Sequence, residues 1–267
     1  MSAPAWSAVR LHVERGGTGE PLLLITGLGY ATWCWTELRE RLEVRHSVIC
    51  FDNRGTGRSE KPRGPYSMAM MADDAAAVLA DAGIESAHVL GHSMGGYIAQ
   101  TLALRHPQRV RSLVLIGTSP GGPEGEPLPA ETQAAWIAAA KLSPGDNVRT
   151  TMPRSFSRGW TESHPAQFED ILRRRLEFPT PLECWLAQYQ ACADFFAAGA
   201  KVEDISAPSL VIHGSDDRIV PVANGRLLAR RLPNCRYVEL PMVGHLPYLE
   251  DPDGIDRLML EPLRGNV

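Results

Sequence analysis

The 267-residue chain has few cysteines and no long apolar run, and each absence excludes a class of protein. Its five cysteines form no Cys-x-x-Cys pair and leave one over in any pairing, which favours reduced thiols over a disulfide framework. No apolar run reaches the length that crosses a bilayer. The first residues have neither the basic start nor the apolar stretch of a signal peptide. We therefore expect a cytoplasmic protein that does not bind membranes.

Strong charge of either sign is also lacking, since the formal net charge is −4. This balance gives no electrostatic reason to bind nucleic acid. His, Asp and Cys residues show no metal-ligand spacing, and the glycines of residues 16–19 precede the first buried strand, unlike a dinucleotide-binding motif. We expect no metal, no cofactor and a small-molecule substrate. The sequence leaves the monomer and the homodimer open.

Apolar runs typical of buried strands alternate with helical patterns along most of the chain, after a half-exposed strand that ends near Gly16. This alternation predicts an α/β fold with a mostly parallel sheet that is covered by helices on both faces. The expected buried strands span residues 22–25, 47–51, 87–91, 110–116, 209–213 and 236–240. The expected helices span residues 33–42, 68–82, 93–105 and 222–231, and a last one follows Pro252.

The alternation stops between residues 120 and 205, where only helices are expected, at 130–142, 146–156, 165–178 and 181–196. We interpret this stretch as a helical lid inserted into a core formed by residues 1–119 and 206–267. Its aromatic side chains can anchor the lid by packing or can line an apolar substrate pocket. The pocket candidates are Trp136, Trp160 and Trp185 of the lid, with Gly27 and Trp33 of the core.

The segment Gly91-His92-Ser93-Met94-Gly95 joins an expected strand to an expected helix. A strand that turns directly into a helix has a cramped backbone, which explains the glycines two residues before and after the serine. The Ser93 hydroxyl would then stand at the edge of the sheet. The Met94 N–H, at a positive helix N-terminus, would face a developing oxyanion. We interpret Ser93 as a nucleophile rather than a helix-capping serine.

A serine nucleophile needs a histidine base, which a carboxylate orients. Two aspartates, Asp216 and Asp217, follow the strand at 209–213, and His245 follows the next strand. The order serine, acid, histidine is that of the serine hydrolases with a strand–turn–helix nucleophile. His92, which lies next to Ser93, is expected to be structural, and so are Asp52 and Cys34.

The chain resembles the α/β-hydrolase superfamily over nearly its full length. The resemblance rests on the segments above, on residues 52–59 and on Glu250-Asp251-Pro252. The resemblance implies that the catalytic acid is the aspartate four residues before Pro221, which is Asp217, with Asp216 as the alternative. It also implies that the Leu28 N–H is the second oxyanion donor beside the Met94 N–H. Relatives usually carry His-Gly where this chain has Thr26-Gly27, but a backbone donor does not depend on that side chain.

Residues 52–59, 65–67 and 91–96 look most like the 3-oxoadipate enol-lactonase and carboxylesterase group. This resemblance implies hydrolysis of a carboxylic ester or lactone, with a sizeable apolar part, through an acyl-enzyme on Ser93. A thioesterase, a carbon–carbon bond hydrolase and a perhydrolase on the same triad remain alternatives. A lyase or cyclase that uses His245 as a base and a ligand-binding receptor that retains the triad are alternatives from other classes.

Overall fold

A seven-stranded sheet with the order β1-β3-β2-β4-β5-β6-β7 forms the centre of the computed structural model, which describes residues 9–260. Only β1 pairs antiparallel, with β3, and all other neighbours are parallel. The α/β fold predicted from the alternating pattern is confirmed. The strands are β1 Val13–Gly16, β2 Glu20–Ile25, β3 His46–Phe51, β4 Ala87–His92, β5 Val110–Ile116, β6 Ser209–Gly214 and β7 Cys235–Leu240.

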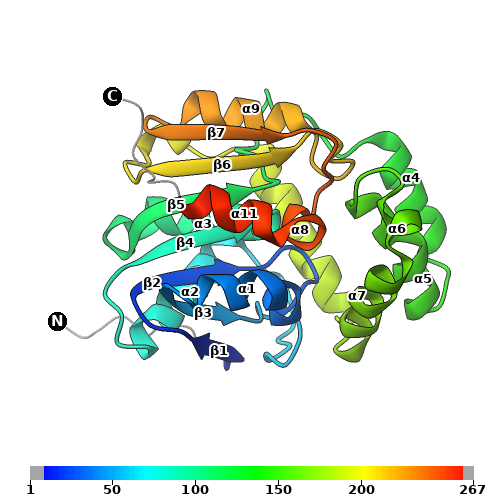
Figure 1. The fold of residues 1–267 in the computed structure, drawn as a ribbon, viewed down its shortest axis with the longest axis horizontal. Helices are drawn as coiled ribbons and strands as arrows, with labels where there is room; N and C mark the ends of the chain where they lie inside the picture. The colour runs from blue at the N-terminus through cyan, green and yellow to red at the C-terminus, as the bar shows by residue number, and fades with distance from the viewer. Residues whose placement is uncertain (1–8, 261–267) are drawn as a thin grey trace.

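Helices cover both faces of this sheet, as Figure 1 shows, with α1 and α11 on one face and α2 and α3 on the other. The helices outside the insertion are α1 Thr36–Leu42, α2 Met68–Asp81, α3 Met94–Arg105, α9 Val222–Arg231, α10 Pro247–Glu250 and α11 Pro252–Leu260. No helix within residues 9–260 is long and apolar enough to cross a membrane.

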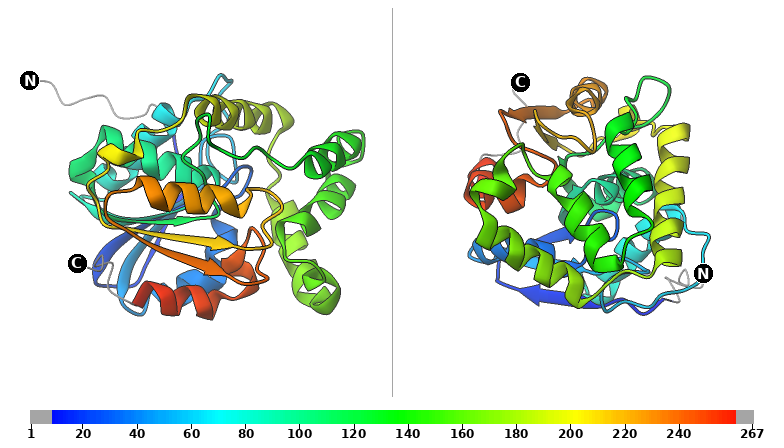
Figure 2. Two further views of the ribbon diagram at one scale, coloured as in Figure 1. Left: turned by 90° about the horizontal axis from the view of Figure 1, so that it is seen from above. Right: turned by 90° about the vertical axis from the view of Figure 1, so that its right-hand side faces the viewer.

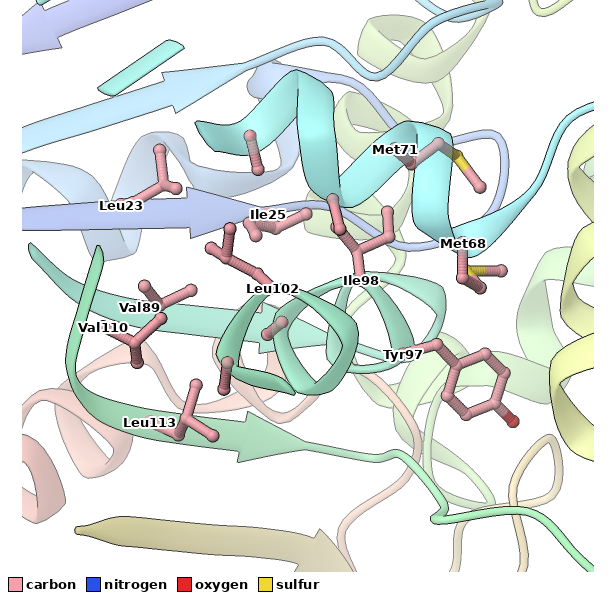
Figure 3. Close-up of a cluster of buried hydrophobic side chains, with 14 of the residues drawn as sticks. Leu23, Ile25, Met68, Met71, Val89, Tyr97, Ile98, Leu102, Val110 and Leu113 are labelled. Atoms are coloured by element: carbon pink, nitrogen blue, oxygen red, sulfur yellow. The ribbon is translucent and has the colours of Figure 1, made fainter. Parts of the chain in front are cut away.

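Side chains of β2 show why its sequence is a continuous apolar run. Leu22 and Leu24 belong to the hydrophobic cluster on one face of the sheet, and Leu23 and Ile25 belong to the cluster on the other. All four are at most 1% exposed. Figure 3 shows the second cluster, in which Ile98 and Leu102 of α3 lie over the sheet. A strand that is buried on both faces has no polar positions to alternate, so the run is uninterrupted.

The helical insertion between β5 and β6 consists of α4 Ala130–Ala139, α5 Pro144–Thr151, α6 Trp160–Ser163, α7 Pro165–Glu177 and α8 Leu182–Ala198. Helices α4 to α7 lie beyond the end of the sheet at which the parallel strands finish (Figures 1 and 2). Ligands of such sheets bind at the carboxyl ends of the strands. The insertion therefore covers the end of the sheet where a site is expected.

Helix boundaries differ from the prediction mainly in and beside this insertion. The helix expected at 146–156 ends at Thr151 and continues as a 3-10 turn, Met152–Ser155. Pro153 explains the change, because proline has no N–H to continue an α-helical ladder. The helix expected at 33–42 likewise begins as a 3-10 turn, Thr32–Trp35. The short helices α6 and α10 were missed, since four residues are too few to show a period.

Candidate active site

Ser93 occupies the sharp turn between β4 and α3. Its backbone angles, φ 55° and ψ −119°, are strained for a residue with a side chain. A Cβ at Gly91 would collide with the Gly95 carbonyl, and one at Gly95 with the Ile25 carbonyl, so both positions require glycine. The Ser93 N–H donates to the Ile116 carbonyl oxygen at 2.9 Å, and the residue is half-buried. The turn therefore holds a partly accessible hydroxyl in a rigid frame.

His245 and Asp217 come from the loops after β7 and β6, and they form a buried pair. His245 Nδ1 lies 2.7 Å from Asp217 Oδ2, and the two side chains are 5% and 0% exposed. The other carboxylate oxygen, Oδ1, accepts the Ile219 and Val220 N–H groups, each at 2.8 Å. These bonds fix the carboxylate so that one oxygen faces the imidazole.

The charge state of Asp217 follows from this environment. Burial alone would raise the pKa of the carboxyl, but attraction to His245 and hydrogen bonds from His213 and His245 hold the pKa well below its usual range. His213 Nε2 lies 3.3 Å from Asp217 Oδ2. Asp217 is therefore ionised at neutral pH and can stabilise a positive charge on His245.

Asp216, the alternative acid, points elsewhere. Its carboxylate accepts the Arg158 backbone N–H at 2.7 Å and pairs with the Arg158 guanidinium. Arg158 belongs to the insertion, so Asp216 joins the insertion to the loop that follows β6. Of the two aspartates, only Asp217 faces the histidine.

His92, the neighbour of Ser93 in the chain, is hydrogen-bonded to the His245 loop. Its Nε2 donates to the His245 carbonyl oxygen at 2.9 Å, and its Nδ1 accepts from the Tyr248 hydroxyl at 3.1 Å. Burial, together with the nearby His245, lowers the pKa of His92 well below its usual value. Because the ring is neutral and both nitrogens are occupied, His92 has the structural role that the sequence suggested.

Residues 26–30, which contain the predicted oxyanion donor Leu28 and are called the oxyanion loop below, pack against Ser93. A Cβ at Gly27 would lie 3.2 Å from Ser93 Cβ, so Gly27 brings this backbone close to the serine. The turn is closed by the Tyr30 N–H, which donates to the Gly27 carbonyl oxygen at 3.2 Å. Within residues 9–260, neither the Leu28 nor the Met94 N–H has an acceptor. Two free amides therefore come from the two segments that meet at Ser93.

The tryptophans proposed for the pocket divide into two groups. Trp185 lies against the oxyanion loop, since a Cβ at Gly29 would come 3.0 Å from its Cδ1. Trp136 is its edge-on neighbour, with ring centroids 6.1 Å apart, and both rings are half-buried. Trp160 is 7% exposed and stacks on Phe156 at 4.4 Å, within the apolar cluster that also contains Leu22 and Leu24 of β2. This placement favours packing for Trp160 and leaves Trp136 and Trp185 as pocket candidates.

Trp33 lines a separate cavity of about 340 Å³ between the edge of the sheet and α7. The cavity walls include Asp52, whose carboxylate accepts the Thr32 and Arg58 N–H groups at 2.6 and 2.7 Å. Asp52 is thus held in the tight turn that the sequence suggested. Cys34 is buried, and burial raises the pKa of its thiol well above the usual value, which fits core packing. Residues 9–260 contain no group of three or more His, Cys, Asp or Glu placed to hold a metal ion.

Sequence reasoning missed the contacts between the insertion and the His245 loop. The His245 and Leu246 N–H groups both donate to the Ser155 carbonyl oxygen, at 2.9 and 3.1 Å. The Glu250 carboxylate accepts the Gly244 and Ser157 N–H groups, each at 2.9 Å. Most of these groups are backbone atoms, which carry no signal in the side-chain pattern.

A family model described as the alpha/beta hydrolase fold matches residues 20–252. A putative carbamate hydrolase (RutD) of Azorhizobium caulinodans is 32% identical over 94% of this chain and 93% of its own. A thermophilic esterase of Thermogutta terrifontis has a TM-score of 0.78 at 28% identity and covers 95% of this chain and 92% of its own. The enol-lactonase of Burkholderia xenovorans has a TM-score of 0.80 at 26% identity, over 96% and 97%. The chain therefore belongs to the α/β-hydrolase family.

Proposed function

We propose that this protein is a serine hydrolase that cleaves a carboxylic ester or lactone through an acyl-enzyme on Ser93. The observation that carries the proposal is the buried His245–Asp217 pair, 2.7 Å between Nδ1 and Oδ2, on loops next to the Ser93 turn. An ionised carboxylate on Nδ1 leaves Nε2 as the nitrogen that can take a proton from a serine.

In the proposed reaction the Ser93 oxygen attacks the carbonyl carbon of the substrate while His245 takes the hydroxyl proton. Asp217 stabilises the resulting imidazolium, and the Leu28 and Met94 N–H groups bind the oxyanion. Collapse of the tetrahedral intermediate breaks the bond to the leaving alkoxide, which receives the proton from His245. A water molecule, deprotonated by His245, then releases the acid and restores Ser93.

Two further observations support an ester or lactone with an apolar part. The esterase and the enol-lactonase share the fold over nearly the whole chain. The half-buried ring of Trp185 lies against the oxyanion loop with Trp136 edge-on to it, and there the two rings would contact the acyl or alcohol group of a bound substrate. We assign residues 120–205 as the lid and residues 1–119 and 206–267 as the core that carries the triad.

Treatment with a fluorophosphonate tests the nucleophile. We expect the intact mass of the wild-type protein to rise by one phosphonyl group, and Ser93→Ala to remain unmodified. Ser119, buried on the loop after β5, offers a matched control, and Ser119→Ala should still be labelled. Full hydrolytic activity in Ser93→Ala would exclude the acyl-enzyme mechanism.

A substrate panel then separates the bond classes on the same triad. p-Nitrophenyl esters of increasing chain length probe the pocket, and γ-lactones, acyl thioesters, aryl carbamates and vinylogous 1,5-diketones represent the other classes. We expect the ester and lactone substrates to show the highest kcat/KM. A labelled Ser93 with no turnover of any substrate would instead favour a binding protein that retains the triad.

A further inference from the structure

Gln188 is a fully buried amide on α8, the last helix of the insertion, and it binds two loops of the sheet domain. Its Oε1 accepts the Gly29 N–H at 3.0 Å, and its Nε2 donates to the Arg54 carbonyl oxygen at 2.8 Å. An N–H faces the oxygen and a carbonyl faces the nitrogen, so the partners define a single orientation of the amide. The insertion is thereby joined by one side chain to the oxyanion loop and to the turn after β3.

The peptide groups of Gly29 are held from the insertion on both sides. Besides the bond from its N–H to Gln188, its carbonyl oxygen accepts the Arg175 guanidinium at 3.2 Å and the Thr180 hydroxyl at 3.3 Å. The ring of Trp185, one turn before Gln188, lies directly against Gly29. The N–H and the carbonyl of Gly29 are therefore both hydrogen-bonded to the insertion.

Gly29 directly follows Leu28, whose N–H is one of the proposed oxyanion donors. Gly29 has a φ of 68°, a conformation that glycine adopts freely, so the loop sequence alone leaves its direction open. An acceptor on the Gly29 N–H fixes the plane of the Leu28–Gly29 peptide. Because neighbouring peptide planes are linked through only two dihedrals, fixing this plane also restricts the direction of the Leu28 N–H.

We propose that Gln188 is a positioning residue that holds the oxyanion loop so that the Leu28 N–H faces the carbonyl oxygen of the substrate. The inference rests on the proposed function, since it presumes acyl transfer at Ser93. Gln188 touches no reacting atom and acts through Gly29. Oxyanion binding strengthens in the transition state, so loss of Gln188 should lower kcat and leave KM nearly unchanged.

Gln188→Met tests this, because methionine has a similar length and no amide. Gln190→Met is the matched control, on the same helix but exposed, with its amide bonded to Asp194. Both are assayed with p-nitrophenyl butyrate and with the corresponding thionoester, whose sulfur is a weak acceptor and gains little from amide donors. Rates are expressed per site titrated with fluorophosphonate, so that misfolded protein is not counted.

We expect Gln188→Met to lower kcat for the ester by about tenfold or more and to affect the thionoester much less. Gln190→Met should change neither rate. Thr180→Val, which removes one donor to the Gly29 carbonyl oxygen, should lower the ester-to-thionoester ratio in the same direction and by less. Thr180→Val still tests the proposal if Gln188→Met folds too poorly to be titrated.

Equal losses on ester and thionoester, or an ester rate within about twofold of Gln190→Met, would overturn the positioning role. Labelling of the wild-type protein separates this failure from that of the proposed function. If fluorophosphonate does not label Ser93, both ideas fail. If it labels Ser93 and the ratio stays constant in the variants, only the role of Gln188 fails.

Discussion

The sheet and the inserted helices bury their apolar residues to different degrees. Residues 22–25 of β2 are at most 1% exposed, whereas Ile137 and Leu182 of the insertion are 67% and 69% exposed. Helix α4 buries only Thr132 and Ala139. The sheet has apolar clusters on both faces, whereas helix α5 of the insertion has no buried residue. The sheet therefore supplies a rigid frame, and the insertion depends on that frame for its position.

The two regions share apolar contacts, such as the stacking of Phe195 of α8 on Tyr97 of α3, and they also share hydrogen bonds that lie on the loops of the candidate site. Ser155 binds the His245 loop through its carbonyl, and Gln188 binds the oxyanion loop through its amide. The Ser93 turn, in contrast, is held by β5 and by glycine packing within the sheet domain. We infer that the sheet places the nucleophile, whereas the insertion adjusts the groups that assist it.

The largest expected effect tests whether the sheet loops supply the reacting groups. Asp217→Asn should lower kcat/KM for p-nitrophenyl butyrate by about 10⁴-fold, because the amide favours the wrong tautomer of His245. Asp216→Asn is the matched control, since that side chain faces Arg158. It should stay within about tenfold of wild type. Comparable losses of kcat/KM in the two variants would contradict the assignment of Asp217 as the catalytic acid.

Stability should show the contrast in burial directly. Leu24→Ala removes a fully buried side chain of β2 and should lower the free energy of unfolding by about 2–5 kcal/mol. Leu182→Ala makes the same change at an exposed position of α8 and should cost no more than about 0.5 kcal/mol. Urea unfolding followed by circular dichroism measures both. A larger loss for Leu182→Ala would mean that the insertion surface is covered in solution.

The neutral His92 beneath the site predicts a pH dependence of stability. Its pKa is lowered in the folded protein, so the unfolded chain binds more protons once the pH falls below about 6.5. The free energy of unfolding should then decrease with falling pH, by at most about 1.4 kcal/mol per pH unit from this residue.

His92→Gln removes this titration, and Tyr248→Phe is the control that loses the bond to Nδ1 but keeps the imidazole. We expect the stability curves of wild type and His92→Gln, measured by urea unfolding from pH 7 to 5, to converge as the pH falls. Parallel curves would mean that His92 titrates alike in the folded and unfolded chain. The Tyr248→Phe curve should keep the wild-type slope.

The smallest expected effect concerns the ion pair that joins the insertion to the loop after β6. The Arg158 side chain is 69% exposed, so its pairing with Asp216 is screened by water. Arg158→Ala should cost less than about 1 kcal/mol of stability, and its effect should largely vanish in an Asp216→Asn background. An additive double variant would show that the pair contributes nothing.

Much of the sheet domain was predictable because its signals are local. Each buried strand is a short apolar run, and the glycines around Ser93 are required by a turn that the same residues form. The order of Ser93, Asp217 and His245 follows from the order of the strands that they end. The family resemblance favoured Asp217 over Asp216, and in the structure Asp217 is the one that faces His245, whereas Asp216 faces Arg158.

The insertion was predictable only as a set of helices. Its boundaries shifted at Pro153, Trp160 lies in an apolar cluster shared with the sheet, and Gln188 carried no signal. Helical patterns show which residues repeat along one face but not what that face meets. The amino-acid sequence thus defines the fold and the proposed reacting side chains, since strand burial and turn geometry are local properties. Tertiary packing alone determines how the insertion holds the oxyanion and histidine loops, because those contacts join groups far apart in the chain, and many of them are backbone atoms.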